Sequence, residues 1–415
     1  MKVALVHEWL TNLAGSERVL LALTKLFPRA PVFTATFRPG RLPAEFRQLD
    51  VRTTFLDRLP LPHQALLPLM PMAFESLDLR DYDLVITSSH ACAKGVLTRA
   101  DALHVAYCHT PIRYAWDLYH DYQATLPKVA RPASAWLLHR LRLWDLAASA
   151  RVDRFVANSR TVARRIAKWY RRPATVIHPP IQVSRFAPGH PGDRFVLVSR
   201  LVPYKQVDLA IAAFGRLGLP LDIVGQGPEY RRLARQAGKN VRFLGYLSDE
   251  EVAATLGRAR ALVFTAEEDF GLVPLEAMAC GRPVVAFRRG GAMETVVEGL
   301  TGTFFDEPTP EAVAAAVTRA LHVDWDPAFI RQHAARYDEA VFLAWMRAYL
   351  DRALAAREAD FTDALLGVPA ADEHPTTPAS GLPADGRPGA PASSRPHEAV
   401  PDSIEAIVPD AGGRR

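Results

Sequence analysis

The stretch that most constrains the fold covers residues 259–286, ARALVFTAEEDFGLVPLEAMACGRPVVA. Its run ALVFTA is short and continuously apolar, as a buried parallel strand requires, and it ends in two carboxylates, the second of which is Glu268. Residues 269–271 form a polar turn, and Pro274 is typical of the first turn of a helix. We therefore expect a strand, a helix that begins near Val273, and a second strand.

Two carboxylates of this stretch are placed to contact one ligand. Chemistry on an open parallel sheet gathers at the carboxyl edge, where Glu268 would lie. Glu276 follows eight residues later, in the expected first turn of a helix whose free N–H groups suit a phosphate. Because carboxylates accept hydrogen bonds from hydroxyls, the combination suits a sugar nucleotide. Taken alone, a solvated Glu268 and a Glu276 that only complements the helix dipole explain the pattern equally well.

The rest of the chain repeats this alternation of strand and helix, which predicts an α/β protein with two doubly wound units. The first unit offers the strand segments MKVALV, APVFTATF, DVRTTFL, YDLVITSS, VAYC and DRFVANS, and the second offers RFVLVSRL, LDIVGQGP, VRFLGYL and TGTFFD besides the stretch above. We expect the two units to face each other across a cleft. The expected boundaries are 1–180, 181–335, a closing helix at 336–358, and a disordered tail rich in Pro, Ala and Gly at 359–415.

Composition and charge exclude several classes of protein. The net charge of +5 is spread along the chain without a lysine-rich block, which argues against nucleic acid as a partner. Three widely spaced cysteines, Cys92, Cys108 and Cys280, predict neither disulfides nor a metal cluster. The apolar start is too short for a signal peptide, and no apolar run approaches the roughly 18 residues of a membrane span. We expect a cytoplasmic protein, possibly peripheral on the inner face of the membrane.

The apolar segment 59–74 is broken by prolines and has three interpretations. It could cover the acceptor site or dip into a membrane surface. A buried irregular connection is at least as good an explanation.

Two cations of the second unit also lie at a strand end. Arg200 and Lys205 flank the turn after its first strand, where they could clamp a diphosphate, although solvated surface charge is the usual role of such residues. The segment GQGPEY, which begins at Gly225, partly resembles a dinucleotide-binding fingerprint. It lacks the third glycine and the later acidic residue, so a nicotinamide site is not favoured.

The first unit offers two candidate ligand contacts. The small-residue loop at Gly15 and Ser16 would let a ligand approach the backbone. His109 follows the strand VAYC and precedes Arg113. A lone histidine is usually structural, but one at the end of a parallel strand is better placed than most to contact a ligand.

These motifs together resemble the retaining glycosyltransferases with two facing Rossmann domains, family 4 in the usual sequence classification. The resemblance rests on EDFGLVPLEAMACGRPVVA, VSRLVPYKQVDLAI and DIVGQGP and extends to about Ala356. The segments LVHEWLTNLAGSERVL and YCHTPIRYAWD further resemble the mannosyltransferase-like branch that builds bacterial O-antigen and exopolysaccharide repeats. The implied fold is the GT-B architecture.

The resemblance implies a role for each matched position. The implied contacts are the reacting sugar for His109 and Glu268, the ribose for Glu276, the diphosphate for Arg200 and Lys205, and the rest of the donor for Gly15, Ser16, Gly225, Phe270, Gly271 and Leu272. A glycine pair is common in the first loop of the family, whereas here Ala14 precedes Gly15.

The resemblance also implies a mechanism. Front-face attack would retain the anomeric configuration, and the acceptor hydroxyl would pass its proton to the departing diphosphate. No protein nucleophile, metal or other cofactor is then expected, because the cations would replace a metal. We expect transfer of a hexose, mannose from GDP-mannose in the first instance, to a lipid-linked or polysaccharide acceptor. The alternatives are a UDP- or ADP-sugar donor, and a non-catalytic sugar-nucleotide-binding subunit of a polysaccharide assembly complex.

Overall fold

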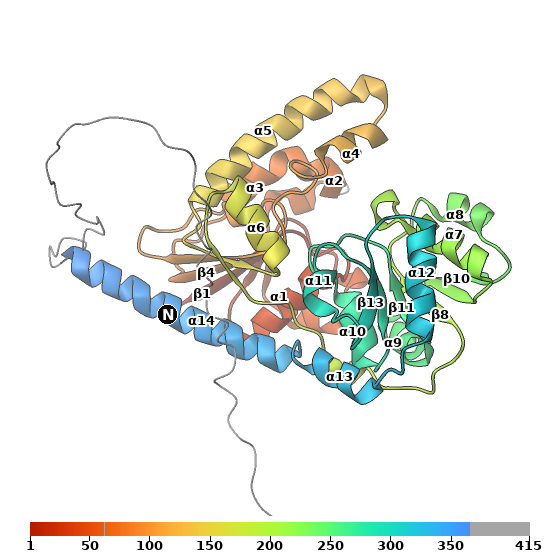
Figure 1. Cartoon of the computed structure of the whole chain (residues 1–415). Helices are drawn as coiled ribbons and strands as arrows, with labels where there is room; N and C mark the ends of the chain where they lie inside the picture. Colours follow the sequence, from red (N-terminus) through yellow and green to blue (C-terminus); the bar gives the residue numbers. More distant parts are fainter. Residues whose placement is uncertain (62, 366–415) are drawn as a thin grey trace, which may run out of the picture. The chain divides into compact units, whose positions relative to one another are not determined.

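The first half of the chain forms a seven-stranded parallel sheet (Figure 1). The computed structural model describes residues 1–61 and 63–365. The strands are β1 (Val3–His7), β2 (Val32–Thr34), β3 (Val51–Thr53), β4 (Leu84–Ser89), β5 (Leu103–Cys108), β6 (Arg154–Ala157) and β7 (Ala174–Val176). Their order in the sheet is β3-β2-β1-β4-β5-β6-β7, with every neighbouring pair parallel. The six strands expected from the sequence are present, and β7 was not expected.

Helices cover both faces of this sheet. They are α1 (Gly15–Leu26), α2 (His63–Leu66), α3 (Met70–Glu75), α4 (Tyr119–Thr125), α5 (Arg131–Ala150) and α6 (Arg160–Trp169). Alternate residues of β1 point to opposite faces, so Leu5 packs in the cluster that contains α1, and Ala4 and Val6 pack in the cluster that contains α3 and α5. This two-sided burial explains why the strands are apolar without interruption.

The second half forms a six-stranded parallel sheet with the strand order β10-β9-β8-β11-β12-β13. Its strands are β8 (Phe195–Val198), β9 (Leu221–Val224), β10 (Val241–Gly245), β11 (Leu262–Phe264), β12 (Val284–Phe287) and β13 (Gly302–Phe305). Its helices are α7 (Val207–Leu217), α8 (Tyr230–Gln236), α9 (Asp249–Arg258), α10 (Leu272–Ala279), α11 (Ala292–Thr295), α12 (Pro310–Leu321) and α13 (Pro327–Ala335). The order reverses between β8 and β11, where doubly wound sheets bind their ligands. The two predicted Rossmann-like domains are confirmed.

The helix predicted near Val273 is α10, which begins at Leu272. Gly271 precedes it with φ of 85°, a backbone conformation that favours glycine. Glu276 is the fifth residue of the helix and therefore lies in its second turn. The prediction of a first-turn carboxylate was wrong by one turn.

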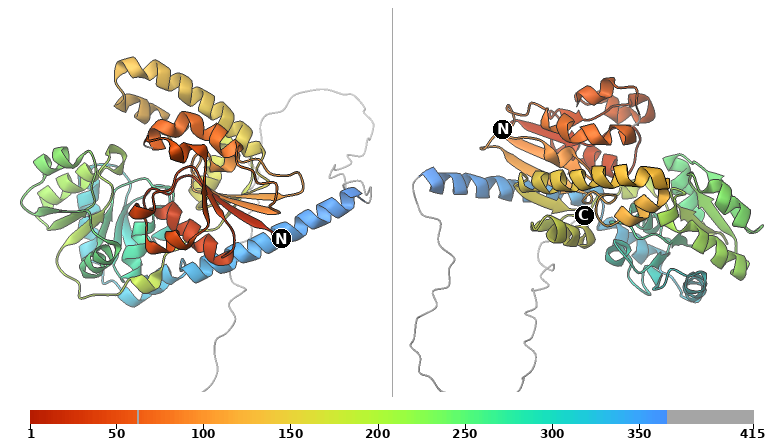
Figure 2. Two further views of the ribbon diagram at one scale, coloured as in Figure 1. Left: turned by 180° about the vertical axis from the view of Figure 1, so that it is seen from behind. Right: turned by 90° about the horizontal axis from the view of Figure 1, so that it is seen from above.

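The last helix, α14 (Glu339–Leu365), packs against the first sheet although it follows the second one in sequence (Figures 1 and 2). Phe342, Met346 and Leu350 of α14 are buried in one cluster with Leu5 and Ile86. The helix therefore ties the end of the folded chain to its beginning. It extends past residue 358, and the expected disordered tail lies outside the described residues from 366 onward.

The proline-broken segment 59–74 contains the short helices α2 and α3 in place of an irregular loop. Leu66, Met70 and Phe74 are fully buried against the first sheet, whereas the Met72 side chain is 54% exposed. Four described residues of the segment are therefore core, whereas Leu61 and Leu69 are exposed like Met72. Within residues 1–61 and 63–365, none of the helices has the length and apolar character needed to cross a bilayer.

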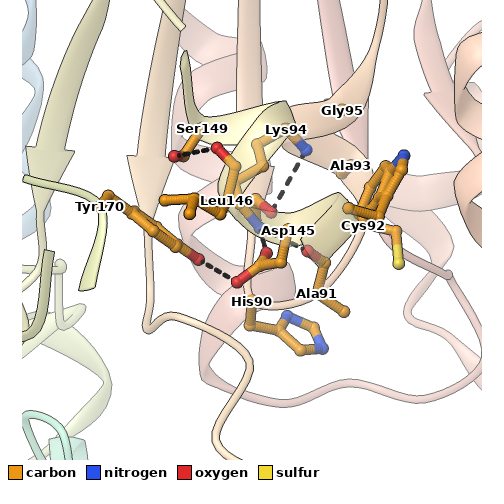
Figure 3. A network of polar contacts seen from close by, with 12 residues as sticks. His90, Ala91, Cys92, Ala93, Lys94, Gly95, Asp145, Leu146, Ser149 and Tyr170 are labelled. Carbon is orange, nitrogen blue, oxygen red and sulfur yellow. Dashed lines mark hydrogen bonds and ion pairs between the residues drawn. The ribbon is translucent and has the colours of Figure 1, made fainter. Parts of the chain in front are cut away.

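A buried ion pair fastens α5 to the loop after β4 (Figure 3). Lys94 and Asp145 are both almost inaccessible to solvent, and Lys94 Nζ also donates a hydrogen bond of 2.7 Å to the carbonyl oxygen of Ala91. The second carboxylate oxygen of Asp145 accepts hydrogen bonds from the Tyr170 hydroxyl at 2.8 Å and the Trp116 indole at 2.7 Å. Burial lowers the pKa of Lys94, but the charge of Asp145 outweighs it and holds that pKa above its usual value.

We predict that Asp145→Leu lowers the free energy of unfolding by about 3–5 kcal/mol, because it leaves a buried ammonium without its carboxylate. The double variant Lys94→Met/Asp145→Leu should recover much of this loss, since it removes both charges. Urea denaturation followed by circular dichroism measures both values. Arg80→Ala, at the fully exposed Arg80–Asp78 pair, serves as the control and should leave the unfolding curve unchanged. A single variant as stable as the wild type would contradict the prediction.

Candidate functional site

The loop between β11 and α10 is held in place by two glycines. Gly291 donates a backbone hydrogen bond of 2.9 Å to the carbonyl oxygen of Glu268. Gly290 has φ of +59°, and a Cβ at this position would overlap the same carbonyl oxygen. A Cβ at Gly291 would overlap the backbone of Phe270. The loop that carries Glu268 can therefore adopt this position only against glycines.

Lys205 contacts this loop directly. Its ammonium group forms an ion pair with the carboxylate of Glu268, and its carbonyl oxygen accepts a hydrogen bond of 2.8 Å from the Thr265 hydroxyl. Burial lowers the pKa of Lys205 to about 8, and the charge of Asp269 opposes this shift while those of Arg113 and Arg200 add to it. The structure thus brings together Glu268, Lys205 and, within electrostatic range, the exposed Arg200.

Two arginines of the first half neutralise the neighbouring Asp269. Arg165 forms an ion pair with Asp269, and Arg113 Nη1 lies 3.5 Å from the same carboxylate. Arg165 also lies 3.0 Å from Asp117. The cations around the β11–α10 loop therefore come from both halves of the chain: Arg113 and Arg165 from the first, and Lys205 from the second.

Sequence reasoning missed Arg165, although a signal was present. Helix α6 carries Arg160, Arg164 and Arg165 in its first two turns. Cations at the N-terminal end of a helix oppose the helix dipole, so they gain little from their own helix. Such a position indicates a role toward an external anion or, as found here, toward a carboxylate of another element.

A cavity of about 310 Å³ lies beside the start of α10. Glu276 and Leu272 line it, together with Leu13, Arg18, Leu21, Pro43, Glu45, Pro180, Ile181, Gln182, Arg185, Phe186, Asp249, Glu250 and Glu339. Arg18 and Arg185 form ion pairs with Asp249 at 2.7 and 2.9 Å. Burial raises the pKa of Glu276, and the two arginines partly oppose this shift. Five acidic residues and two arginines thus line the cavity, and both arginines are paired with Asp249.

The first loop approaches this cavity through Gly15. A Cβ at Gly15 would lie 3.1 Å from the Leu272 side chain, so the structure brings these two predicted residues together. Helix α1 begins at Gly15, and the Ser16 hydroxyl donates a hydrogen bond of 3.0 Å to Glu17. Neither Gly15 nor Ser16 lines the cavity itself, whereas Arg18 in the next turn does.

The other predicted residues lie away from the cavity. His109 is 9% exposed and its Nε2 lies 2.8 Å from Ser88 Oγ. The Phe270 side chain is buried and stacks on the His178 ring. Gly225 has φ of +128°, and a Cβ there would overlap the Ser199 carbonyl, so this glycine lets the loops after β8 and β9 pack together. Glu268 and Glu276 therefore do not line one cavity, in contrast to the expected shared site.

Comparison with known proteins identifies two domains along the chain. Residues 13–185 match Glycosyltransferase Family 4, and residues 182–339 match Glycosyl transferases group 1. The chain is 36% identical over 192 residues to a GDP-mannose-dependent alpha-(1-6)-phosphatidylinositol monomannoside mannosyltransferase of Mycolicibacterium smegmatis, a match that covers 38% of this chain and 50% of that protein. It is 38% identical over 176 residues to a glycogen synthase of Mycobacterium tuberculosis, with 39% and 42% covered. The chain spans half or less of the length of these relatives.

The fold has been seen in solved structures. The crystal structure of Anabaena Alr3699/HepE in complex with UDP and glucose superposes with a TM-score of 0.65 at 19% identity, covering 84% of this chain and 99% of that one. The two domain matches follow each other: the first contains strands β2–β7 of the first sheet, and the second contains the whole second sheet. The chain therefore consists of a Glycosyltransferase Family 4 domain and a Glycosyl transferases group 1 domain and has the architecture of a GT-B glycosyltransferase.

Proposed function

We propose that the chain is a retaining glycosyltransferase that moves a hexose from a nucleotide diphosphate sugar to a glycan or lipid-linked acceptor. The observation that carries this proposal is the arrangement around α10. A carboxylate, Glu276, lines a cavity at one side of its start, and cations from both sheets surround the loop on the other side. Hydroxyl groups suit the carboxylate, and phosphates suit the cations and the free N–H groups of the helix start.

The proposed donor spans these two places. Glu276 accepts hydrogen bonds from the ribose hydroxyls in the cavity. Lys205 leaves Glu268 and, with Arg200, binds the diphosphate, while the backbone amides of residues 270–272 add donors at the start of α10. Glu268, released from Lys205, then accepts hydrogen bonds from the donor sugar. In this exchange Lys205 stays paired with a negative charge, and the released Glu268 carboxylate stays hydrogen-bonded.

The proposed reaction needs no protein nucleophile. The acceptor hydroxyl oxygen bonds to the anomeric carbon on the face from which the diphosphate departs. The bond between that carbon and the phosphate oxygen breaks, its electron pair stays on the diphosphate, and the diphosphate takes the proton of the hydroxyl. Lys205 and Arg200 stabilise the charge that develops on the leaving group, which is the role that a metal ion has in other enzymes.

The donor is proposed to be GDP-mannose, because the matched Mycolicibacterium smegmatis relative is named as GDP-mannose-dependent. The fold shared with the UDP- and glucose-bound Anabaena protein supports a UDP-sugar as the second candidate, and an ADP-sugar stays open. Incubation with radiolabelled donors and lipid-linked acceptors tests the proposal. Label in a product of retained anomeric configuration is expected. Nucleotide binding without any transferred sugar would favour the non-catalytic subunit, and an inverted anomer would exclude the front-face reaction.

We predict that Glu276→Ala weakens binding of the donor nucleotide by about tenfold or more, since hydrogen bonds to a charged group contribute about 1.5–3 kcal/mol. Isothermal titration calorimetry with GDP and UDP measures the dissociation constant. Glu250→Ala is the matched control, because Glu250 also lines the cavity but is exposed at its rim. Equal affinities for Glu276→Ala and the wild type would contradict the proposal that Glu276 binds the ribose hydroxyls.

A second prediction concerns pH. With its pKa lowered to about 8, Lys205 loses its positive charge as the pH rises above that value. The affinity for a nucleoside diphosphate should therefore fall by about twofold between pH 7 and 8 and then more steeply, by at most about tenfold per pH unit. Lys205→Arg should bind with little change up to pH 9.5, because arginine stays charged. The same decline in both proteins would show that another group titrates.

The solvent-facing side of α5 supports the proposed contact with a membrane surface. Trp136 and Leu143 lie two turns apart on this side and are 66% and 54% exposed, and Arg140 lies between them. The one acidic residue of the helix, Asp145, is buried in the ion pair with Lys94. An amphipathic helix with exposed aromatic and basic side chains and no exposed acid suits an anionic lipid surface.

We predict that the chain sediments with vesicles that contain phosphatidylglycerol and less with pure phosphatidylcholine. Trp136→Ser/Leu143→Ser should reduce this binding by about tenfold or more, since each large apolar side chain contributes about 1.5–3 kcal/mol when fully buried. Trp345→Ser is the matched control, because Trp345 is a similarly exposed tryptophan, at 57%, on α14. If the double variant and Trp345→Ser bind the vesicles alike, this face of α5 does not contact lipid. The same conclusion follows if the double variant changes the oligomeric state in the absence of lipid.

A further inference from the structure

Four polar side chains form a continuous hydrogen-bond chain at the carboxyl edge of the first sheet. Glu17 Oε1 lies 3.3 Å from His7 Nε2, and His7 Nδ1 lies 3.1 Å from Ser88 Oγ. The same Ser88 oxygen lies 2.8 Å from Nε2 of His109. Glu17, His7 and Ser88 are buried, and His109 is the most exposed member at 9%. These hydrogen bonds therefore connect the interior to His109, for which the sequence resemblance implies a contact with the reacting sugar.

The fold fixes each step of this chain. His7 and Ser88 are opposite each other in the register of β1 and β4. Glu17 lies in the first turn of α1, where its other oxygen accepts hydrogen bonds from the Ala14 N–H at 2.9 Å and the Ser16 hydroxyl at 3.0 Å. Burial raises the pKa of Glu17, but its hydrogen bond to His7 and the charge of that ring outweigh burial and leave the pKa below its usual value. Glu17 is therefore a carboxylate.

The number of protons in the chain restricts its arrangement. A carboxylate only accepts hydrogen bonds, so His7 Nε2 carries a proton. The Ser88 hydroxyl has one proton and donates to one of its two histidine neighbours at a time. Burial and the nearby His90 and His7 hold the pKa of His109 far below its usual value, so this ring stays neutral with a single N–H.

We propose that Glu17, His7 and Ser88 are positioning residues that determine which ring nitrogen of His109 carries its proton. When His7 is neutral, its Nδ1 accepts the Ser88 proton, Ser88 Oγ accepts from His109 Nε2–H, and His109 Nδ1 is a bare acceptor. When His7 is protonated, Nδ1–H donates to Ser88, Ser88 donates to His109 Nε2, and His109 Nδ1 carries the proton. Protonation of the buried His7 ring thus changes His109 Nδ1 from a hydrogen-bond acceptor to a hydrogen-bond donor.

The conversion between these two states balances with one proton. A proton that arrives from solvent at His109 Nδ1 displaces the Nε2 proton to Ser88, and the Ser88 proton passes to His7 Nδ1. No other reactant is consumed. Within the described part of the chain, Nδ1 of His109 has no hydrogen-bond partner and is not among the fully buried unpaired atoms, so it is open to this proton and to a ligand.

Whether Nδ1 of His109 accepts or donates decides which group of a donor sugar nucleotide it can contact. For this role of His109 the inference rests on the proposed function. A bare Nδ1 accepts a hydrogen bond from a sugar hydroxyl, whereas Nδ1–H donates one to a phosphate oxygen. The titratable and charged groups around His7 are Glu17 on α1, Glu8 at the end of β1, His90 and Lys94 after β4, and His109 after β5. Glu8 is held as a carboxylate by five hydrogen bonds, four of them from backbone N–H groups. Its charge favours protonation of His90, but burial outweighs it and holds the pKa of that ring below its usual value.

The test is nuclear magnetic resonance of the full chain with 15N-labelled histidine, in which the His109 signals are identified with His109→Gln. At pH 8.5 the shifts should show Nε2 protonated and Nδ1 bare. As the pH falls to 5.5 the two shifts should exchange, without the pattern of an imidazolium at His109. In Glu17→Gln the exchange should move to lower pH by about one unit or more, because the protonated His7 loses its carboxylate partner.

Ser88→Ala should abolish the exchange, since the connecting hydroxyl is absent. His104 is the internal control: its Nε2 lies 3.2 Å from Thr87 Oγ1, outside this chain, and its signals should be unchanged in both variants. If Ser88→Ala does not fold, the pH at which the exchange occurs in Glu17→Gln still tests the inference. Titration of His109 itself to an imidazolium, or an exchange at the same pH in Glu17→Gln and wild type, would overturn the inference. Because this measurement requires no turnover, it is independent of whether glycosyl transfer is detected.

Discussion

Electrostatic pairing around the loop between β11 and α10 is the constraint on which the site depends. This loop carries adjacent carboxylates, and each is matched by cations that the fold brings from elsewhere: Glu268 by Lys205, and Asp269 by Arg113 and Arg165. Half-buried charges are costly unless they are paired, so the loop can hold this position only while both sheets supply their cations. A diphosphate presents the same kind of charge as the carboxylates. The pairing that stabilises the loop is therefore also the chemistry that would accept the donor.

Side chains at the carboxyl edge of the first sheet are held in position by a different means. The sheet buries polar groups that are paired with one another, as in the ion pair of Lys94 with Asp145 and the hydrogen bonds that link Glu17 to His109. Such networks are rigid because leaving any member unpaired is expensive. The ion pair fixes α5 and Trp116, which lies between Arg113 and Asp117 in the loop after β5. Buried polar groups thus position the side chains that contact the second sheet.

Much of the fold could be predicted from the sequence because the signals are local. Apolar strand segments and the turn before α10 each depend on a few neighbouring residues, and all appear in the structure. Strand β7 was missed because it is a partly exposed edge strand between Pro173 and the pair Pro179 and Pro180, a pattern that is typical of a linker. The site was predicted in part: the proximity of Lys205 to Glu268 follows from strand order, since β8 and β11 are neighbours. The contact of Arg165 with Asp269 depends on residues 104 positions apart, and no local pattern specifies such a pair.

The central claim is that one nucleotide diphosphate sugar lies across the start of α10, with its ribose in the cavity and its diphosphate among the cations. A crystal structure of the chain soaked with the donor tests this most directly. The account predicts density for the ribose beside Glu276 and for the diphosphate beside Lys205 and Arg200, with Lys205 moved away from Glu268. A nucleotide bound in another place, with Lys205 still paired to Glu268, would contradict it.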